Sequence, residues 1–298
     1  GISKDGLYMA WDFTVASQEN TTGRAVDIRD DAFARLGDTN LANRTIEGAS
    51  PDINILAYCD QSDINPGPTP SKCGENYPGR TSYNPANPPQ SPSPGANEQR
   101  TVTGYIENVP CYLDVDGCPT GAKFSYDSAG KLTWNTSYKM KVPFLCTIPK
   151  SITDGGVVDP GPTGVYGHGL LGGLNQVRSG GSTREIANVQ DSVWCGANWD
   201  GFSDSDFPTV ALSLKDLSNF SKLTDRMQQG FVNFMMVQRA MVHPDGFADE
   251  PAFTLDHDGP TPIASASAID TSLGAGTRAY YQGHSQGGIM GGAYVALA

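Results

Sequence analysis

The chain has 298 residues, of which 38% are hydrophobic, and this is enough for a buried core in one large or two ordinary domains. Its 20 basic and 32 acidic residues give a formal net charge of −12 at pH 7. An acidic surface repels phosphate backbones and anionic membranes, so we expect no nucleic-acid partner. The sequence has no long apolar run, and we therefore expect no transmembrane segment.

The cysteines predict disulfide bonds. The chain contains an even set of them: Cys59, Cys73, Cys111, Cys118, Cys146 and Cys195. None has the spacing of a metal site, and disulfides indicate an oxidising compartment, which is extracellular or periplasmic. The short loops between the first two cysteines and between the next two favour those pairings, which leaves the last two for each other. Other pairings stay open, as do free buried thiols in a cytoplasmic enzyme.

The first half of the chain predicts strands and loops. Apolar residues at every second position from Leu7 to Val15 predict a half-buried strand. A short helix is expected over 30–36, closed by Gly37, and a strand over 53–58. Residues 60–99 are rich in Pro and Gly, and we expect a disulfide-tethered surface excursion there, with a domain boundary as the alternative. The β-prone runs at 101–113, 123–126, 132–134 and 139–148 predict antiparallel strands.

In the second half, strands alternate with helices. A strand at 164–166 leads into a glycine-rich turn, and Ser182 with Glu185 predicts a capping box for a helix that ends near Val189. We interpret the apolar run at 209–214 as a strand, followed by a long helix over 219–242 with apolar residues three or four apart. Residues 244–275 are irregular and are a possible lid or cap loop, and a strand is expected over 277–282. This alternation predicts a parallel sheet.

The most informative motif is Gly-His-Ser-Gln-Gly at 283–287. A Gly-x-Ser-x-Gly pentapeptide between a strand and a helix is typical of a serine that sits on a strained turn, with its hydroxyl exposed for attack on a carbonyl. β-Prone residues precede Ser285, and further glycines follow it, which allows the next helix to pack closely against the strands. We therefore expect Ser285 to be a nucleophile, and a tight turn without chemistry is the alternative.

A second motif is the glycine-rich segment Val-Tyr-Gly-His-Gly-Leu-Leu-Gly-Gly at 165–173. With Ser285, it resembles the α/β-hydrolase superfamily, in particular secreted bacterial esterases and lipases with a His-Gly-x oxyanion loop, over roughly residues 139 to 298. The resemblance implies that the amides of Leu170 and Gln286 form the oxyanion hole and that His168 and Gly169 shape the loop. It also implies an α/β fold with a mostly parallel sheet flanked by helices, preceded by antiparallel strands and long loops.

The remaining histidines do not complete a catalytic triad. His284 precedes the nucleophile, His243 ends a helix, and His257 lies in an acidic stretch, where it is the least improbable substitute for the base. The resemblance places the acid and the histidine after the serine, so the chain is expected to be the N-terminal part of one hydrolase domain, truncated after the nucleophile helix. The missing residues are then expected on a following segment of the same polypeptide.

No cofactor or metal is expected. The acidic clusters at 114–117 and 200–206 lack the calcium-binding loop pattern, and we interpret both as solvated turns. The favoured function is hydrolysis of carboxylic esters, of small molecules or lipids, through an acyl-enzyme. The alternatives are an inactive hydrolase-like binding or structural protein and a serine peptidase.

Overall fold

The computed structural model describes residues 6, 9, 15–61, 72–154, 157–179, 182–257 and 263–298, without the side chains of 257, 263 and 264. The strands are β1 (Ile53–Asp60), β2 (Glu98–Pro110), β3 (Ser125–Tyr126), β4 (Leu132–Thr133), β5 (Lys139–Pro149), β6 (Thr163–Gly167), β7 (Val193–Ala197), β8 (Thr254–His257), β9 (Ile263–Ser267) and β10 (Ala279–Gly283). The α-helices are α1 (Arg24–Arg35), α2 (Gln176–Ser179), α3 (Thr183–Val189), α4 (Phe207–Lys215), α5 (Ser221–Val242) and α6 (Gln286–Leu297).

The structure also contains short 3-10 turns and one short π-helix. They are the π-helix η1 (Glu19–Gly23) and the 3-10 turns η2 (Leu41–Asn43), η3 (Lys150–Thr153), η4 (Asp204–Asp206), η5 (Leu217–Asn219), η6 (Phe247–Asp249), η7 (Pro251–Phe253) and η8 (Gly274–Gly276). The strand expected from Leu7 to Val15 lies outside the described residues except for Met9 and Val15.

The main sheet is mixed. It has six strands in the order β1-β2-β5-β7-β6-β10, within an α/β fold. The strands from β1 to β7 pair antiparallel along this order, whereas β6 pairs parallel with both β7 and β10. The antiparallel strands predicted at 101–113 and 139–148 are confirmed as β2 and β5, whereas the sheet as a whole is mixed and not mostly parallel. Only the part that carries the candidate site is parallel, because β5 runs opposite to its neighbour β7.

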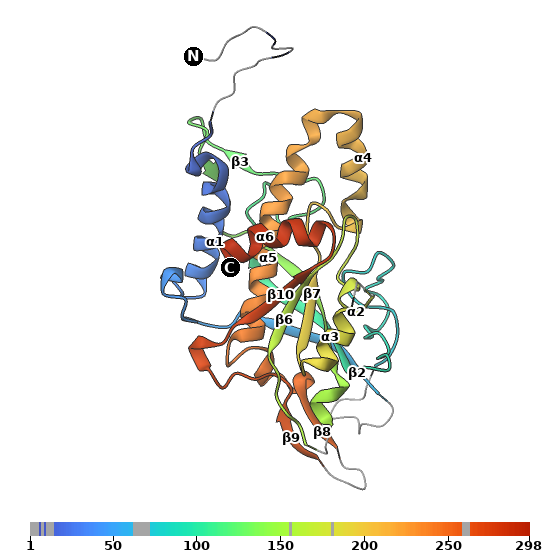
Figure 1. Cartoon of the computed structure of the whole chain (residues 1–298). Coiled ribbons are helices and arrows are strands. Elements are labelled where there is room, and N and C mark those ends of the chain that lie inside the picture. The colour runs from blue at the N-terminus through green and yellow to red at the C-terminus, as the bar shows by residue number, and fades with distance from the viewer. Residues whose placement is uncertain are drawn as a thin grey trace.

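Helices cover both faces of the sheet. Successive residues on one strand face opposite sides, and Val165 packs with α5 and α6 whereas Tyr166 packs with α2 and α3. On β5, Phe144 likewise lies on the face covered by α5 and α6, and Leu145 lies on the face covered by α2 and α3. Figure 1 shows α4 and the first turns of α5 beyond the ends of β6, β7 and β10 at the top of the view, with β8 and β9 beyond the opposite ends.

Several predicted elements differ from the structure. The run at 209–214 lies in α4 and not in a strand, and the missing strand is β7, a short apolar run that is buried throughout. A capping box at Ser203 and Asp206 starts η4, which leads directly into α4, and a proline lies in the first turn of α4. Ser182 precedes α3 but makes no side-chain capping bond, so its predicted capping box is wrong. Helix α1 begins six residues before the predicted 30–36 range, since it runs from Arg24 to Arg35.

Within the described part of residues 244–275, the β8–β9 hairpin lies at the end of the sheet opposite to the serine motif. A bridge between Gly161 and Ile269 places the β8–β9 hairpin next to the residues that precede β6. Ser285, by contrast, follows the opposite, carboxyl end of β10. The position of the described residues therefore gives no support to a lid role for this segment.

The three disulfides have the favoured pairing, Cys59–Cys73, Cys111–Cys118 and Cys146–Cys195. The last joins directly opposed residues of β5 and β7, and both of its cysteines are fully buried. It closes a much longer stretch of chain than the second, with a sequence separation of 49 against 7.

Replacement of Cys146 and Cys195 by alanine is expected to lower the free energy of unfolding by about 4 kcal/mol, and replacement of Cys111 and Cys118 by about 2.5 kcal/mol. The difference arises because a longer loop loses more conformational entropy in the unfolded chain. Urea denaturation of both double variants under oxidising conditions measures it. A smaller loss for the β5–β7 pair would contradict the prediction.

Candidate active site

Ser285 sits on a strained turn between β10 and α6. It has φ 53° and ψ −116°, a backbone region that a residue with a Cβ atom adopts only at a cost of about 1–3 kcal/mol. The His284 amide donates to the Gly167 carbonyl at 3.1 Å, and the Gly287 amide donates to the His284 carbonyl at 2.9 Å. Ser285 is exposed, so the turn presents its side chain to solvent.

The two glycines of the motif are required by close backbone contacts. A Cβ atom on Gly283 would overlap the Gly287 carbonyl, and one on Gly287 would overlap the Gly167 carbonyl and lie 2.8 Å from the His168 oxygen. The start of α6 therefore packs directly on the end of β6. This close approach accounts for the Gly-x-Ser-x-Gly spacing in physical terms.

The glycine loop, residues 167–173, lies beside the serine turn. A Cβ atom on Gly169 would be 3.6 Å from the His284 oxygen and 3.7 Å from the Ser285 Cβ atom. Both segments follow the carboxyl ends of neighbouring parallel strands, β6 and β10. The fold thus brings together the two motifs, which are more than a hundred residues apart in the sequence.

His168 is a buried residue of this loop, with 1% of its surface exposed. Its Nε2 atom accepts the Trp199 amide at 2.7 Å, which leaves the ring proton on Nδ1, where it donates to the Gly169 carbonyl at 2.7 Å. Burial lowers the pKa of His168 to about 4, against the smaller opposing effects of the Gly169 carbonyl and Asp206. The ring is therefore neutral near pH 7, and both of its nitrogens are occupied within the loop.

The hydrogen bonds of the Gly169–Leu170 peptide orient its amide. The Gly169 oxygen accepts both His168 Nδ1–H and the Gly172 amide, the latter at 3.0 Å. In a trans peptide the N–H points away from the carbonyl, so these bonds direct the Leu170 N–H to the other side of the peptide plane. Within the described part of the chain, neither the Leu170 amide nor the Gln286 amide donates a hydrogen bond.

A change of pH is expected to reveal the buried neutral state of His168. Its ordinary pKa is 6.5 and its folded pKa is about 4, so the unfolded chain binds more protons between these values. The contribution of His168 to stability is therefore complete above pH 6.5 and is lost as the pH falls towards 4, by on the order of 3 kcal/mol.

Comparison with a His168→Gln variant isolates this effect. Burial raises the pKa of Asp200 to about 6, which gives an opposite pH dependence below that value, but this contribution is present in both proteins. Urea midpoints measured in steps from pH 7 to pH 4 should fall more steeply for the unmodified protein than for the variant. Parallel curves would show that His168 is not a buried neutral group.

Ser285 has no base or acid partner among the described side chains. His243 faces Gly48 and Asp245, at 3.1 Å in each case, and His284 is exposed. The side chain of His257 lies outside the described residues. In the described ranges, no group of three or more His, Cys, Asp or Glu residues is arranged to hold a metal ion, and none of their helices is long and apolar enough to cross a membrane.

The acidic stretch from Asp200 to Asp206 is not a solvated turn. The side chains of Asp200 and Asp206 are 13% and 0% exposed, and both pair with Arg226 of α5 at 2.8 Å. One sign of this burial is visible in the sequence, because Arg226 lies between the apolar positions Leu223 and Met227 of the long helix. The other cluster does form turns, in which Asp114 and Asp116 accept the amides of Lys123 and Lys139.

Comparisons with known proteins give one distant structural match. No protein-family model and no curated protein matches the chain. A crystal structure from Bacteroides fragilis NCTC 9343, provisionally described as an acetyl xylan esterase, has 9% sequence identity and a TM-score of 0.37. The alignment covers 95% of this chain and 52% of that protein, so the chain spans about half of its length. At this level of similarity, the candidate site depends on the geometry of the chain itself.

Proposed function

We propose that this chain supplies the nucleophile and the oxyanion hole of a serine-dependent hydrolase that acts on carboxylic esters. The observation that carries the proposal is the positive φ of Ser285, which lies exposed between a parallel strand and a helix. Backbone strain of this kind clusters at functional sites, where the surrounding structure holds it in place. A glycine would adopt the same conformation without strain, and a serine there adds a hydroxyl at the carboxyl edge of the sheet.

In this proposal, Ser285 attacks the ester carbonyl and gives its proton to the base. The ester C–O bond then breaks, the alcohol leaves with that proton, and water hydrolyses the resulting acyl-enzyme to release the acid. The amides of Leu170 and Gln286 stabilise the oxyanion, since both lie next to the serine turn and neither is used elsewhere in the described residues. His168 and Gly169 shape the loop. Removal of one oxyanion donor typically lowers kcat by about 10²–10³-fold, so the placement of these amides is a large part of the expected catalysis.

The base and its acid are proposed to lie on a following segment of the same polypeptide. The support is that His168 and His243 make hydrogen bonds elsewhere and that His284 is exposed. The substrate is an ester of a small molecule or a lipid, and the chemistry of an acyl-enzyme needs no cofactor. Three disulfides agree with a secreted protein, extracellular or periplasmic.

Labelling with a fluorophosphonate tests the proposal. The reagent reacts with activated serines, so the full encoded polypeptide should be labelled and mass spectrometry should place the label on the peptide that contains Ser285. Heat-unfolded protein is the control, since its serines are not activated. A label on another residue, or no label on protein that is shown to be folded, would refute the proposed role of Ser285.

A non-catalytic hydrolase-like binding protein is the second candidate, and the absence of a described histidine partner for Ser285 favours it. It predicts a folded polypeptide that is inert to fluorophosphonate. If Ser285 is labelled, turnover of short p-nitrophenyl esters compared with peptide amides separates an esterase from a peptidase.

A further inference from the structure

The loop that follows β7 braces the glycine loop. We call residues 198–206 the bracing loop. Its Trp199 amide donates to His168 Nε2 at 2.7 Å, and its Phe202 carbonyl accepts the Leu171 amide at 2.9 Å. The Asp204 amide donates to the Gly172 carbonyl, also at 2.9 Å. The Gly169–Leu170 peptide therefore lies between His168 and Leu171, and each of these two residues is hydrogen-bonded to the bracing loop.

Asp206 holds the bracing loop in its conformation. Its Oδ2 atom accepts the Gly201 amide at 2.7 Å, the Ser203 amide at 3.1 Å and the Ser203 hydroxyl at 2.8 Å. Gly201 has φ +90°, so the chain reverses here in a conformation that most residues avoid. One buried carboxylate oxygen therefore closes the turn that presents Trp199, Phe202 and Asp204 to the glycine loop.

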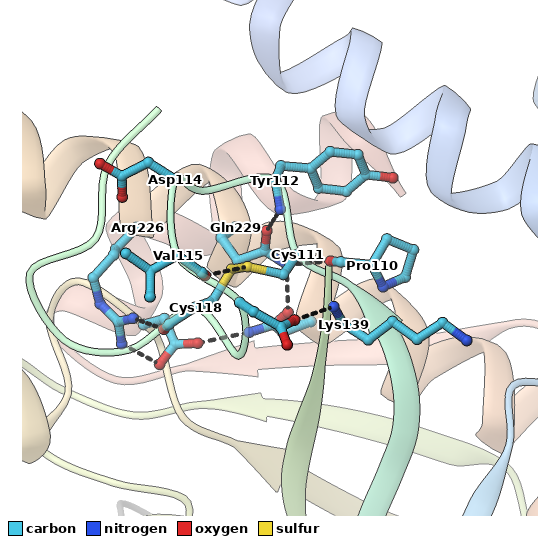
Figure 2. Close-up of a disulfide and its surroundings, with 12 residues drawn as sticks. Pro110, Cys111, Tyr112, Asp114, Val115, Cys118, Lys139, Arg226 and Gln229 are labelled. Atoms are coloured by element: carbon cyan, nitrogen blue, oxygen red, sulfur yellow. Dashed lines mark hydrogen bonds and ion pairs between the residues drawn. A yellow bond between two sulfur atoms is a disulfide. The ribbon is translucent and has the colours of Figure 1, made fainter. Parts of the chain in front are cut away.

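Arg226 anchors Asp206 to the core. Its Nε atom donates to the other oxygen of Asp206 at 2.8 Å, and the guanidinium also bonds Asp200 and the Cys118 carbonyl. Figure 2 shows Arg226 beside the Cys111–Cys118 disulfide, on the same side of α5 as Gln229, which bonds Pro110 and Tyr112. Arg226 is 3% exposed and Asp206 is fully buried, so water does not compete for these bonds.

We propose that Asp206 is a positioning residue for the oxyanion hole, acting through the bracing loop on the Leu170 amide. The proposal rests on the proposed function, and it adds a residue that touches neither the substrate nor Ser285. Oxyanion donors act only at short and defined distances, so a displacement of about 1 Å costs roughly a hundredfold in rate. Without the three hydrogen bonds to Asp206 Oδ2, the bracing loop would be free to shift by such a distance and to displace the Leu170 amide with it.

The test is Asp206→Asn in the full encoded polypeptide, assayed with p-nitrophenyl acetate. The new amide group cannot accept from the bracing loop and from Arg226 at the same time, because one of its two atoms is a donor. We expect kcat to fall roughly tenfold to a hundredfold with KM within about threefold, because the interaction is made in the transition state. The inhibition constant of phenylboronic acid, which forms a tetrahedral adduct at the serine, should rise by a similar factor.

Asp38→Asn is the matched control. Asp38 is also a buried carboxylate that pairs with an arginine of α5, Arg239, and accepts a backbone amide, that of Glu47, but it lies outside the bracing loop. A purely structural role predicts that both variants lose kcat only in proportion to the unfolded fraction, which thermal unfolding measures. We expect the control to keep kcat within about twofold while its stability falls.

Equal kcat in the two variants, or a loss that matches the unfolded fraction, would overturn the proposal. If Asp206→Asn does not fold, Ser203→Ala keeps the carboxylate and removes the Ser203 hydroxyl, with its bonds to Asp206 and to the Ser205 hydroxyl, and kcat should then fall by roughly threefold. An unchanged kcat in that variant would also overturn the proposal. If the proposed function itself is wrong, fluorophosphonate does not label Ser285 in the unmodified protein, and this distinguishes that outcome from a failure of the positioning role of Asp206.

Discussion

Replacement of Ser285 by glycine is expected to abolish ester hydrolysis and to raise the stability of the protein. Glycine adopts a φ of 53° without the steric cost that serine bears, so removal of the Cβ atom relieves the strain of the turn. Part of this gain is offset because glycine has more freedom in the unfolded chain, and we expect a net increase of about 1 kcal/mol in the free energy of unfolding.

Ser285→Ala is the matched variant. It removes the hydroxyl but keeps the Cβ atom and the strain, so its stability should stay within about 0.5 kcal/mol of the unmodified protein. Both variants should lose kcat/KM by roughly a thousandfold or more, since no neighbouring group can replace the nucleophile. Urea denaturation and p-nitrophenyl ester assays measure the two effects. Equal stability of the two variants would show an unstrained turn, and residual activity in the alanine variant would show a different nucleophile.

Local patterns in the sequence predicted the elements that position Ser285. Strand β10 and helix α5 have the expected ranges within about two residues, because each is marked by its own periodicity and by the glycine or proline next to it. The pairing of the cysteines was also predicted. These features depend on residues that are close together in the sequence, or on a small set of partners.

The exchange of β7 for α4 shows what local patterns do not contain. Val193–Ala197 is buried on both faces of the sheet and therefore has no alternation, whereas the apolar residues of α4 include Leu212 and Leu214, which are 52% and 81% exposed. The apolar run at 209–214 was interpreted as a strand although it lies in a helix, and the apolar run at 193–197 was overlooked although it is a strand. The antiparallel direction of β2 and β5 was predicted, but the pairing of β5 with β7 was not, because β7 itself was overlooked.

The candidate site was predicted in part. Ser285 and the glycine loop have motifs with a fixed spacing, and the structure brings the two segments together. Asp206 and Arg226 have no such motif, because their contact joins residues 20 positions apart through the packing of α5 against the bracing loop. An acidic stretch that is rich in serine and glycine has the same composition whether it is solvated or buried around an arginine.

Replacement of Gly287 by alanine is expected to lower both stability and activity. The new Cβ atom would overlap the Gly167 carbonyl and lie 2.8 Å from the His168 oxygen. Both are backbone atoms, so no side-chain rotation relieves the contact, and α6 must move away from the end of β6. We expect a loss of about 1–3 kcal/mol in the free energy of unfolding. We also expect kcat to fall by roughly a hundredfold, because the same movement separates the glycine loop from the serine turn.

Gly292→Ala on the same helix is the control, since a Cβ atom there meets nothing within 4 Å. It should raise the free energy of unfolding by up to about 1 kcal/mol through helix propensity and leave kcat within about twofold. Denaturant unfolding and ester assays on both variants separate the contact from the general effect of alanine in α6. If Gly287→Ala loses stability but keeps kcat, the contact between α6 and the glycine loop stabilises the fold without placing the oxyanion donors. If it loses neither, the close packing at Gly167 is absent in solution.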